Sequence, residues 1–167
     1  MFSQLLLRCV LFIFLILAGF GFSTNSAAAI LRQHHDAPGI LRYHSQVSIK
    51  DDFGHAWQVV LYKLFKPGEL ENINLRLVGF PGVVEFNHPR SLEIVTANNK
   101  LLSASDFYAE RSPAANVGEY KFTDILSKLP STDSLKLYLP VQNPQPLVLK
   151  IPQAVVTEWQ WLITQVK

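Results

Sequence analysis

Apolar and polar residues alternate along two neighbouring stretches in the first half of the chain, residues 41–49 and 57–65. The first stretch places four apolar residues on one face, Leu41, Tyr43, Val47 and Ile49. The second stretch does the same with Trp57, Val59, Leu61 and Phe65. A period of two is typical of a strand with one buried face, so both stretches are predicted to be strands.

The segment between these strands, residues 51–55, indicates a hairpin turn. A three-residue loop of Asp52, Phe53 and Gly54 puts the glycine where a type I turn followed by a bulge needs a positive φ. This register pairs apolar residues across the hairpin, Val47 with Val59 and Ile49 with Trp57. A shift by one residue would turn the apolar residues of the second strand to the polar face, so the pattern and the turn chemistry agree.

Five further apolar stretches, separated by Gly, Pro and Asn residues, are predicted to be short strands. They span residues 73–78, 91–96, 117–122, 135–139 and 147–151. About seven short strands indicate a mostly β fold, an antiparallel sandwich or an open barrel. The Gly-Phe-Pro-Gly sequence at residues 79–82 predicts a type I turn.

The end of the chain changes from strand spacing to helix spacing. Pro152 suits the first position of a helix, where a missing N–H is not needed. Six apolar residues follow on one face, Val155, Val156, Trp159, Leu162, Ile163 and Val166. The pattern predicts a C-terminal amphipathic helix that packs onto the sheet. A shorter helical turn is predicted over residues 123–129, with Thr123 as its cap and Pro130 after its end.

The first 29 residues have the order of a secretory signal peptide. A single charge, Arg8, precedes the apolar run of residues 9–22, and Ala27, Ala28 and Ala29 follow. Because this run is shorter than the roughly 20 residues that span a bilayer, we expect cleavage after Ala29, with an uncleaved signal anchor as the alternative. What remains is a single β-rich domain, residues 30–167, with no transmembrane helix after cleavage.

Removing residues 1–29 changes what the composition implies. The only cysteine, Cys9, lies in that segment, so the remaining domain forms no disulfide and has no thiol nucleophile. The 15 basic residues of the chain include Arg8, and all 13 acidic residues come after residue 29. The domain is therefore close to neutral, which gives no reason to expect nucleic acid as a partner.

The histidines give no convincing metal site. The run His34-His35-Asp36 offers three ligand types, but consecutive residues rarely converge on one ion, and a solvated terminal arm is the favoured interpretation. In the predicted hairpin His44 and His55 are on the order of 23 Å apart and cannot share an ion. His55 is expected opposite Asp51, as a structural cross-strand contact. We assign no metal-binding or cofactor-binding residue.

No catalytic motif is found after residue 29. The sequence contains neither a G-x-S-x-G elbow nor an S-x-x-K element there. We therefore assign no catalytic residue and expect a protein that is not an enzyme. An exported hydrolase with a convergent site remains an alternative, and it would need a buried Ser or Asp beside His55 or His88 in a cleft.

Two aromatic residues depart from the pattern of a plain core. Trp161 lies two positions after Trp159, about 200° around the helix axis, and should therefore face away from the buried stripe. An exposed tryptophan is a typical contact anchor, although a loop or the N-terminal arm is an equal candidate to cover it. Phe80, in the predicted turn, is the second candidate for a partner contact.

Four segments carry a family resemblance. They are Ala37-Pro38-Gly39, residues 51–58, Leu75-Arg76-Leu77-Val78-Gly79-Phe80-Pro81-Gly82 and Ala115-Asn116-Val117-Gly118. Together they resemble an uncharacterised family of small exported cyanobacterial proteins, classed as a domain of unknown function. The resemblance covers nearly all of residues 30–167 and implies a photosynthetic bacterium, hence the periplasm or the thylakoid lumen. It brings no catalytic residues.

These observations lead to one functional hypothesis and one further alternative beside the hydrolase. The leading hypothesis is an exported, non-enzymatic domain that binds a membrane-associated protein complex at a membrane surface. The other alternative is a carrier of a small apolar ligand in a β-barrel pocket lined by residues such as Tyr43 and Phe65.

Overall fold

The alternating stretches form the predicted hairpin. Strands β2 (Ile40–Lys50) and β3 (Ala56–Phe65) are antiparallel, and Val47 lies opposite Val59 as Ile49 lies opposite Trp57. Gly54 has a φ of 87°, which confirms the glycine in the turn. These strands are part of a computed structural model that describes residues 30–37, 40–65, 68, 72–108, 112–129 and 133–164.

The hairpin is the centre of a five-stranded antiparallel sheet with the order β1-β2-β3-β4-β7. The other strands are β1 (Ile30–Ala37), β4 (Asn72–Val78) and β7 (Val117–Lys121). Strand β1 corrects the sequence interpretation, because its residues were expected to form a solvated arm. Ladder pairing with β2 satisfies the backbone of this segment although its sequence does not alternate.

A second, four-stranded antiparallel sheet has the order β6-β5-β8-β9. Its strands are β5 (Leu92–Thr96), β6 (Leu101–Ala104), β8 (Leu135–Leu139) and β9 (Leu147–Ile151). The sequence pattern missed β6, which has four residues and follows a tight turn with Asn99 at a φ of 60°. The described residues thus form nine strands rather than about seven.

Two helices accompany the sheets in the part of the chain that the structure describes. Helix α3 (Gln153–Thr164) is the predicted C-terminal helix, and α2 (Thr123–Leu126) is one turn long. Thr123 does not cap α2, contrary to the prediction, because the N-cap residue is Phe122 and the Thr123 hydroxyl accepts a hydrogen bond from the Ile73 N–H at 3.0 Å. The threonine instead ties α2 to the start of β4.

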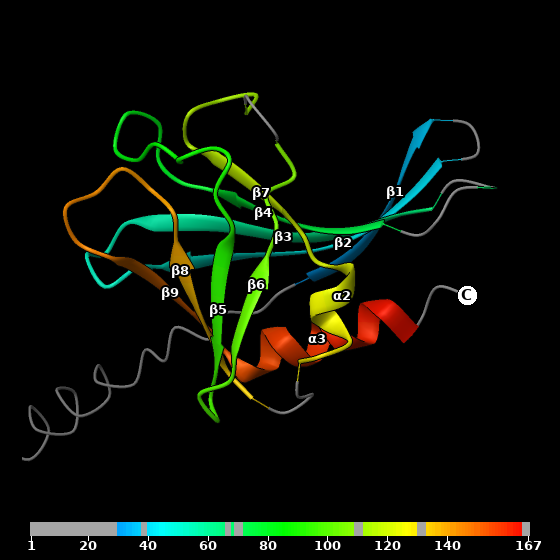
Figure 1. Cartoon of the computed structure of the whole chain (residues 1–167). Coiled ribbons are helices and arrows are strands. Elements are labelled where there is room, and N and C mark those ends of the chain that lie inside the picture. The colour runs from blue at the N-terminus through cyan, green and yellow to red at the C-terminus, as the bar shows by residue number, and fades with distance from the viewer. Residues whose placement is uncertain are drawn as a thin grey trace, which may run out of the picture.

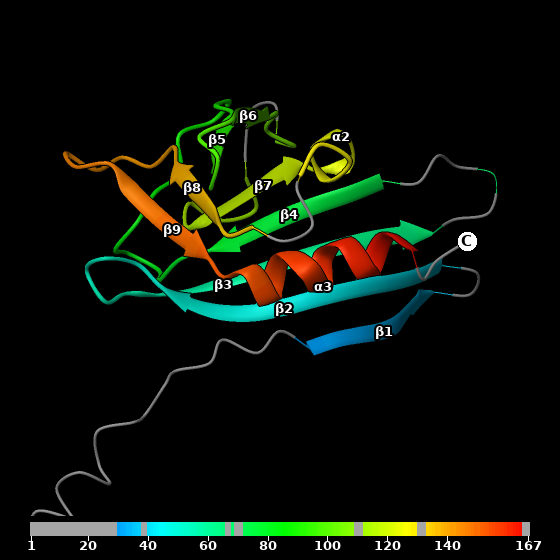
Figure 2. The ribbon, with the colours of Figure 1, turned by 90° about the horizontal axis from the view of Figure 1, so that it is seen from below.

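The two sheets form a sandwich-like arrangement and not a closed barrel. In Figure 2, the smaller sheet lies over the β4 and β7 side of the larger sheet, and α3 lies along β2 and β3. The inner residues of both sheets and the buried stripe of α3 form one hydrophobic cluster. The outer face of the larger sheet is therefore the face that points away from α3 and from the hydrophobic cluster.

The turn after β4 differs from the predicted type I turn. A hydrogen bond runs from the Val83 N–H to the Phe80 carbonyl at 3.2 Å, so Pro81 and Gly82 are the central residues. Gly82 has a φ of 77°. Proline followed by a residue with positive φ is the pattern of a type II turn, which explains why glycine occupies this position.

Candidate functional site

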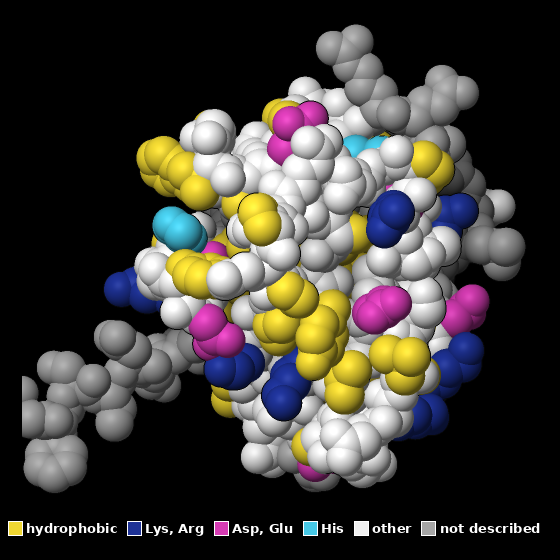
Figure 3. Space-filling model, turned by 60° about the vertical axis from the view of Figure 1, so that its left-hand side comes forward, with side chains coloured by type: hydrophobic (Ala, Val, Ile, Leu, Met, Phe, Trp, Pro, Cys, Tyr) yellow, Lys and Arg dark blue, Asp and Glu magenta, His cyan; other side chains and the backbone are white. Residues whose placement is uncertain are grey.

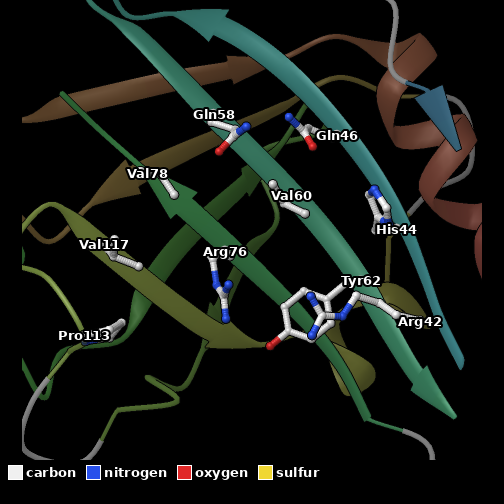
Figure 4. Close-up of a pocket in the computed structure, with 10 residues that line it drawn as sticks. All are labelled: Arg42, His44, Gln46, Gln58, Val60, Tyr62, Arg76, Val78, Pro113 and Val117. Carbon is white, nitrogen blue, oxygen red and sulfur yellow. The ribbon is translucent and has the colours of Figure 1, made fainter. Parts of the chain in front are cut away.

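A groove of about 320 Å³ lies on the outer face of the larger sheet. Ten residues line it: Arg42, His44, Gln46, Gln58, Val60, Tyr62, Arg76, Val78, Pro113 and Val117. Eight come from alternate positions of β2, β3 and β4, which point away from the core because side chains alternate along a strand. Figure 4 shows Tyr62 and Arg42 at one end of the groove, Val78, Val117 and Pro113 at the other, and Arg76 between.

Glu119 lies beneath the charged end of this groove and is fully buried. Its Oε1 accepts hydrogen bonds from the Tyr62 hydroxyl and from Asn74 Nδ2, the latter at 3.0 Å. Its Oε2 accepts from Arg76 Nε at 2.8 Å and from the Tyr108 hydroxyl at 2.9 Å, and Arg76 Nη2 lies 2.8 Å away. We call these five residues the Glu119 network.

The burial of Glu119 on an outer face is explained by the segment that follows β6. The Lys121 N–H donates to the Ser105 carbonyl at 2.9 Å, and the Phe107 N–H donates to the Glu119 carbonyl at 2.7 Å. This pairing extends the sheet beyond β7 and brings Tyr108 to the Glu119 carboxylate. Strands β3 and β4 and the segment after β6 therefore supply the hydrogen-bond donors that a buried carboxylate requires.

The network favours the neutral form of its two tyrosines and the charged form of its arginine. Burial and the hydrogen bond to Glu119 raise the pKa of Tyr62, and the same causes raise the pKa of Tyr108 to about 12. Burial works against the charged form of Arg76, but the hydrogen bond and the charge of Glu119 outweigh it and raise the arginine pKa. Both tyrosines therefore remain neutral donors at neutral pH, and Arg76 remains a cation.

The two arginines of the groove both lie over the ring of Tyr62. The guanidinium carbon of Arg42 lies 5.3 Å from the centre of the Tyr62 ring, and that of Arg76 lies 5.5 Å from it. Both distances are within the range of cation–π attraction. The Arg76 side chain is 39% exposed, so it is anchored by Glu119 on one side and accessible from the groove on the other. This arrangement suits recognition of an anionic group.

The two predicted contact residues are both exposed, but they lie on different parts of the molecule. Phe80 is 66% exposed and follows the groove residue Val78 by two positions. Trp161 is 55% exposed on α3, whose buried stripe packs against the inner face of the larger sheet, opposite the groove. The predicted direction of Trp161, away from the buried stripe, is confirmed, and Phe80, which was named only as a candidate contact, is also exposed. A contact with a partner stays a prediction at both positions.

The predicted contact between His55 and Asp51 is present and structural. Asp51 Oδ1 accepts from the N–H groups of Phe53 and His55, both at 2.9 Å. Asp51 Oδ2 accepts from Trp57 Nε1 at 3.0 Å and lies 3.3 Å from His55 Nδ1. The carboxylate thus holds the hairpin turn and the buried indole together, which is a common role of aspartate at turns.

One condition of the hydrolase alternative is met. His88 Nδ1 lies 2.6 Å from Asp106 Oδ2, and both side chains are buried beside a cleft of about 430 Å³ that Ser112 also lines. The Ser112 hydroxyl, however, lies within hydrogen-bond distance of the carbonyls of Ala114 and Val117, at 2.8 and 2.6 Å. Within the described residues His88 Nε2 is buried without a hydrogen-bond partner, so the serine is not joined to the histidine.

The interior of the sandwich gives little support to an apolar carrier. The sheets do not close into a barrel, and their inner faces pack against each other and against α3. Phe65, proposed to line such a pocket, is at the end of β3 and 36% exposed, and Tyr43 is half-buried outside the hydrophobic cluster. The aromatic pair therefore does not line a closed interior.

Further observations concern metal and membrane. Among the residues that the structure describes, no group of three or more His, Cys, Asp or Glu side chains is placed to hold a metal ion. The side chains of the run His34-His35-Asp36 lie outside this description. Nor is any described helix long and apolar enough to cross a bilayer. The signal peptide predicted at residues 1–29 also lies outside the described residues.

The outer face of the smaller sheet carries a stripe of apolar side chains. Leu101 is 62% exposed, Tyr138 is 36% exposed, and Val95 and Val148 are half-buried between lysines and a glutamate. Figure 3 looks onto this side of the molecule and shows the apolar side chains gathered across its middle. The stripe is a second exposed apolar region, separate from the groove.

The sequence interpretation did not identify the Glu119 network. The alternation in residues 41–49 did place Arg42, His44 and Gln46 on the polar face of a strand, and the alternation in residues 57–65 turned Gln58, Val60 and Tyr62 away from the apolar face. Nothing in the sequence around Glu119 indicates that this carboxylate is buried, because its partners are 11 to 57 residues away.

Comparison with known proteins gives a family and no function. A family model described as a protein of unknown function (DUF3122) matches residues 29–162, which include every strand and most of α3. No curated protein and no solved structure matches the chain. The match agrees with the resemblance drawn from the sequence, while the cyanobacterial origin stays a prediction. The chain belongs to the family of proteins of unknown function DUF3122.

Proposed function

We propose that this chain is an exported, non-enzymatic binding domain that holds a protein partner at a membrane surface through the groove on the larger sheet. The observation that carries the proposal is the anchoring of Arg76 by the buried Glu119. Burying a carboxylate is costly unless it is fully hydrogen-bonded, so a network that does so and ends in an accessible cation is a candidate for function rather than for stability alone.

The residue types of the groove support binding rather than catalysis. The ten described lining residues are two arginines, one histidine, two glutamines, three valines, one proline and one tyrosine, and they include no carboxylate, serine, threonine or cysteine. The hydroxyl of that tyrosine, Tyr62, already donates to Glu119. Nucleophilic or acid–base catalysis needs a nucleophile beside a base, whereas arginine and glutamine side chains recognise anions and amides.

Export is supported by the order of charge, apolar run and small residues before Ile30. Strand β1 begins at Ile30, the first residue after the expected cleavage site. The resemblance to exported cyanobacterial proteins favours the periplasm or the thylakoid lumen. Intact mass measurement of the protein from its native cells is expected to give a chain that begins at Ile30, and recovery of the full chain from membranes would indicate an uncleaved anchor instead.

The binding function is tested by affinity isolation of the C-terminally tagged chain from gently solubilised membranes of its native cells. We expect a protein to co-elute in stoichiometric amount and to be lost from the Arg76→Lys variant, since lysine keeps the charge but not the planar fork of arginine. The matched control Lys136→Gln removes a cation from the outer face of the smaller sheet and should retain the partner.

Two results would reject this assignment. Recovery of the tagged chain alone would exclude a stable partner under these conditions. Loss of the partner from Trp161→Ala but not from Arg76→Lys would move the binding surface to α3, on the other side of the larger sheet.

A further inference from the structure

The chemistry of the groove is different at its two ends. At one end the guanidinium groups of Arg42 and Arg76 share the Tyr62 ring, with His44 opposite that tyrosine in the sheet register. In the middle of the groove Val60 lies opposite Arg76 across β3 and β4, and at the other end Val78 lies opposite Val117 across β4 and β7. Figure 4 shows this change from charged to aliphatic side chains along the groove.

Arg76 is the residue best prepared to bind an anion. Its Nε and Nη2 are directed to Glu119, and a guanidinium has five N–H donors in a fixed plane. Because Glu119 orients this plane, little conformational entropy is lost when the exposed edge of Arg76 pairs with a ligand. The buried Glu119 also offsets part of the arginine charge, which favours a ligand with one negative charge over a dianion.

The aliphatic end and the rim define the rest of the ligand. Val60, Val78 and Val117 are half-buried and supply an apolar floor beside the cationic end. Gln46 and Gln58 are exposed on the rim, and their side-chain amides both donate and accept hydrogen bonds, as a peptide group requires. A volume of about 320 Å³ is at the small end of the range for ligand sites, so the bound group is short.

From these features we infer that the groove binds a carboxylate joined to a short aliphatic group. This inference rests on the proposed binding function and names the chemistry that the partner presents. Two sources supply this chemistry, the C-terminal carboxylate of a partner chain that ends in aliphatic residues and a free short-chain carboxylic acid. In both cases the carboxylate pairs with Arg76 and the aliphatic part lies on the valines.

The test is a calorimetric titration of the purified domain with four probes. They are an acetylated tripeptide of alanine, valine and leucine with a free carboxylate, the same tripeptide with an amidated end, hexanoate and inorganic phosphate. We expect the free tripeptide to bind and the amidated one to bind at least about tenfold more weakly, because a charge-assisted pair is lost. Phosphate should bind more weakly than the free tripeptide, since it lacks the aliphatic part.

Variants locate the binding in the groove. Arg76→Lys is expected to weaken binding of the free tripeptide about tenfold through loss of the planar fork, and Val78→Ser to weaken it several-fold through loss of the apolar floor. Lys136→Gln is the matched control and should bind as the wild type does. Circular dichroism and thermal unfolding of each variant show whether it is folded. If Arg76→Lys does not fold, Val78→Ser still tests the groove, because this change does not touch the Glu119 network.

The outcomes separate this inference from the proposed function. Equal binding of the free and amidated tripeptides, or stronger binding of phosphate, overturns the carboxylate inference even if a protein is captured at the groove. Tighter binding of the tripeptide than of hexanoate identifies a chain end as the source. Binding of hexanoate alone, with no protein captured from membranes, supports the carboxylate site while rejecting a protein partner.

Discussion

Two buried carboxylates, Asp51 and Glu119, differ in where their hydrogen-bond donors come from. All the hydrogen-bond donors of Asp51 come from residues within six positions of it, in a single turn. The donors of Glu119 come from β3, from β4 and from the segment after β6. Asp51 therefore shapes a local turn, whereas Glu119 exists as a hydrogen-bonded group only once the larger sheet has formed.

This difference also separates a structural role from the binding role that we propose. The Asp51 partners are backbone N–H groups, a surface histidine and a buried indole, and none of them lines the groove. Two of the Glu119 partners, Tyr62 and Arg76, do line it. A carboxylate that collects donors from distant strands orients a surface, while one that collects local donors stabilises a turn.

The largest effect is expected from Glu119→Ala. It leaves the Arg76 charge, the Asn74 amide and two tyrosine hydroxyls without their acceptor, so the free energy of unfolding should fall by about 3–5 kcal/mol. Urea denaturation followed by circular dichroism measures this loss. Glu119→Gln is the matched control, which keeps the side-chain size and one acceptor and should lose less. A loss below about 1 kcal/mol for the alanine variant would contradict the network as described.

A smaller loss is expected from Asp51→Ala. The backbone donors of the turn are rehydrated by water, but the buried Trp57 indole loses its acceptor, so the free energy of unfolding should fall by about 1–3 kcal/mol. The adjacent Asp52→Ala is the control, because that side chain is exposed and its 2.7 Å ion pair with Lys150 is also exposed. Equal losses for the two variants would show that the Asp51 hydrogen bonds contribute nothing specific.

Asp51 also predicts a pH dependence. Burial pushes its pKa up, but hydrogen bonds from Trp57, from the His55 and Phe53 N–H groups and from the His55 ring outweigh burial and lower it from 3.8. A carboxyl with a lowered folded pKa contributes stability above its unfolded pKa and loses it as the pH falls through the folded value. The stability difference between wild type and Asp51→Asn should therefore shrink below about pH 4 in urea denaturation, and a constant difference would contradict it.

The smallest effect is expected from Tyr108→Phe. This change removes one of the four side chains that donate to Glu119, at a partly exposed position, and should lower the free energy of unfolding by about 1 kcal/mol. Because burial and Glu119 raise the Tyr108 pKa to about 12, and burial also raises the pKa of Tyr62 and of Tyr120, the late phenolate step in the ultraviolet titration should be smaller by one tyrosine in this variant than in the wild type. A Tyr108 that ionises near pH 10 would not be bonded to Glu119.

The parts of the fold that could be predicted from the sequence are those governed by local chemistry. The hairpin register followed from alternation and from Gly54, and the exposure of Trp161 followed from its angle to the α3 stripe. Strand β1 was missed because its residues do not alternate, and ladder pairing compensates for this only in the folded sheet. Strand β6 was missed because four residues give too short a pattern.

The groove could be predicted only in part. Polar residues between the apolar positions of β2 placed Arg42, His44 and Gln46 on one face, which is as far as a periodic pattern reaches. The orientation of Arg76 on β4 depends on Glu119, which lies opposite it on the neighbouring strand β7. Whether β4 and β7 are neighbours depends on the order of the strands in the sheet. Strand order is set by the whole chain, so it cannot be predicted from the sequence around either residue.

The placement of the three tryptophans gives the protein two separate optical signals. Trp57 and Trp159 are enclosed in the hydrophobic cluster, and Trp161 is open to solvent on α3. An aqueous collisional quencher such as iodide therefore reaches one indole in the folded protein and all three after unfolding. The quenchable part of the emission reports on the surface of α3, and the protected part reports on the integrity of the interior.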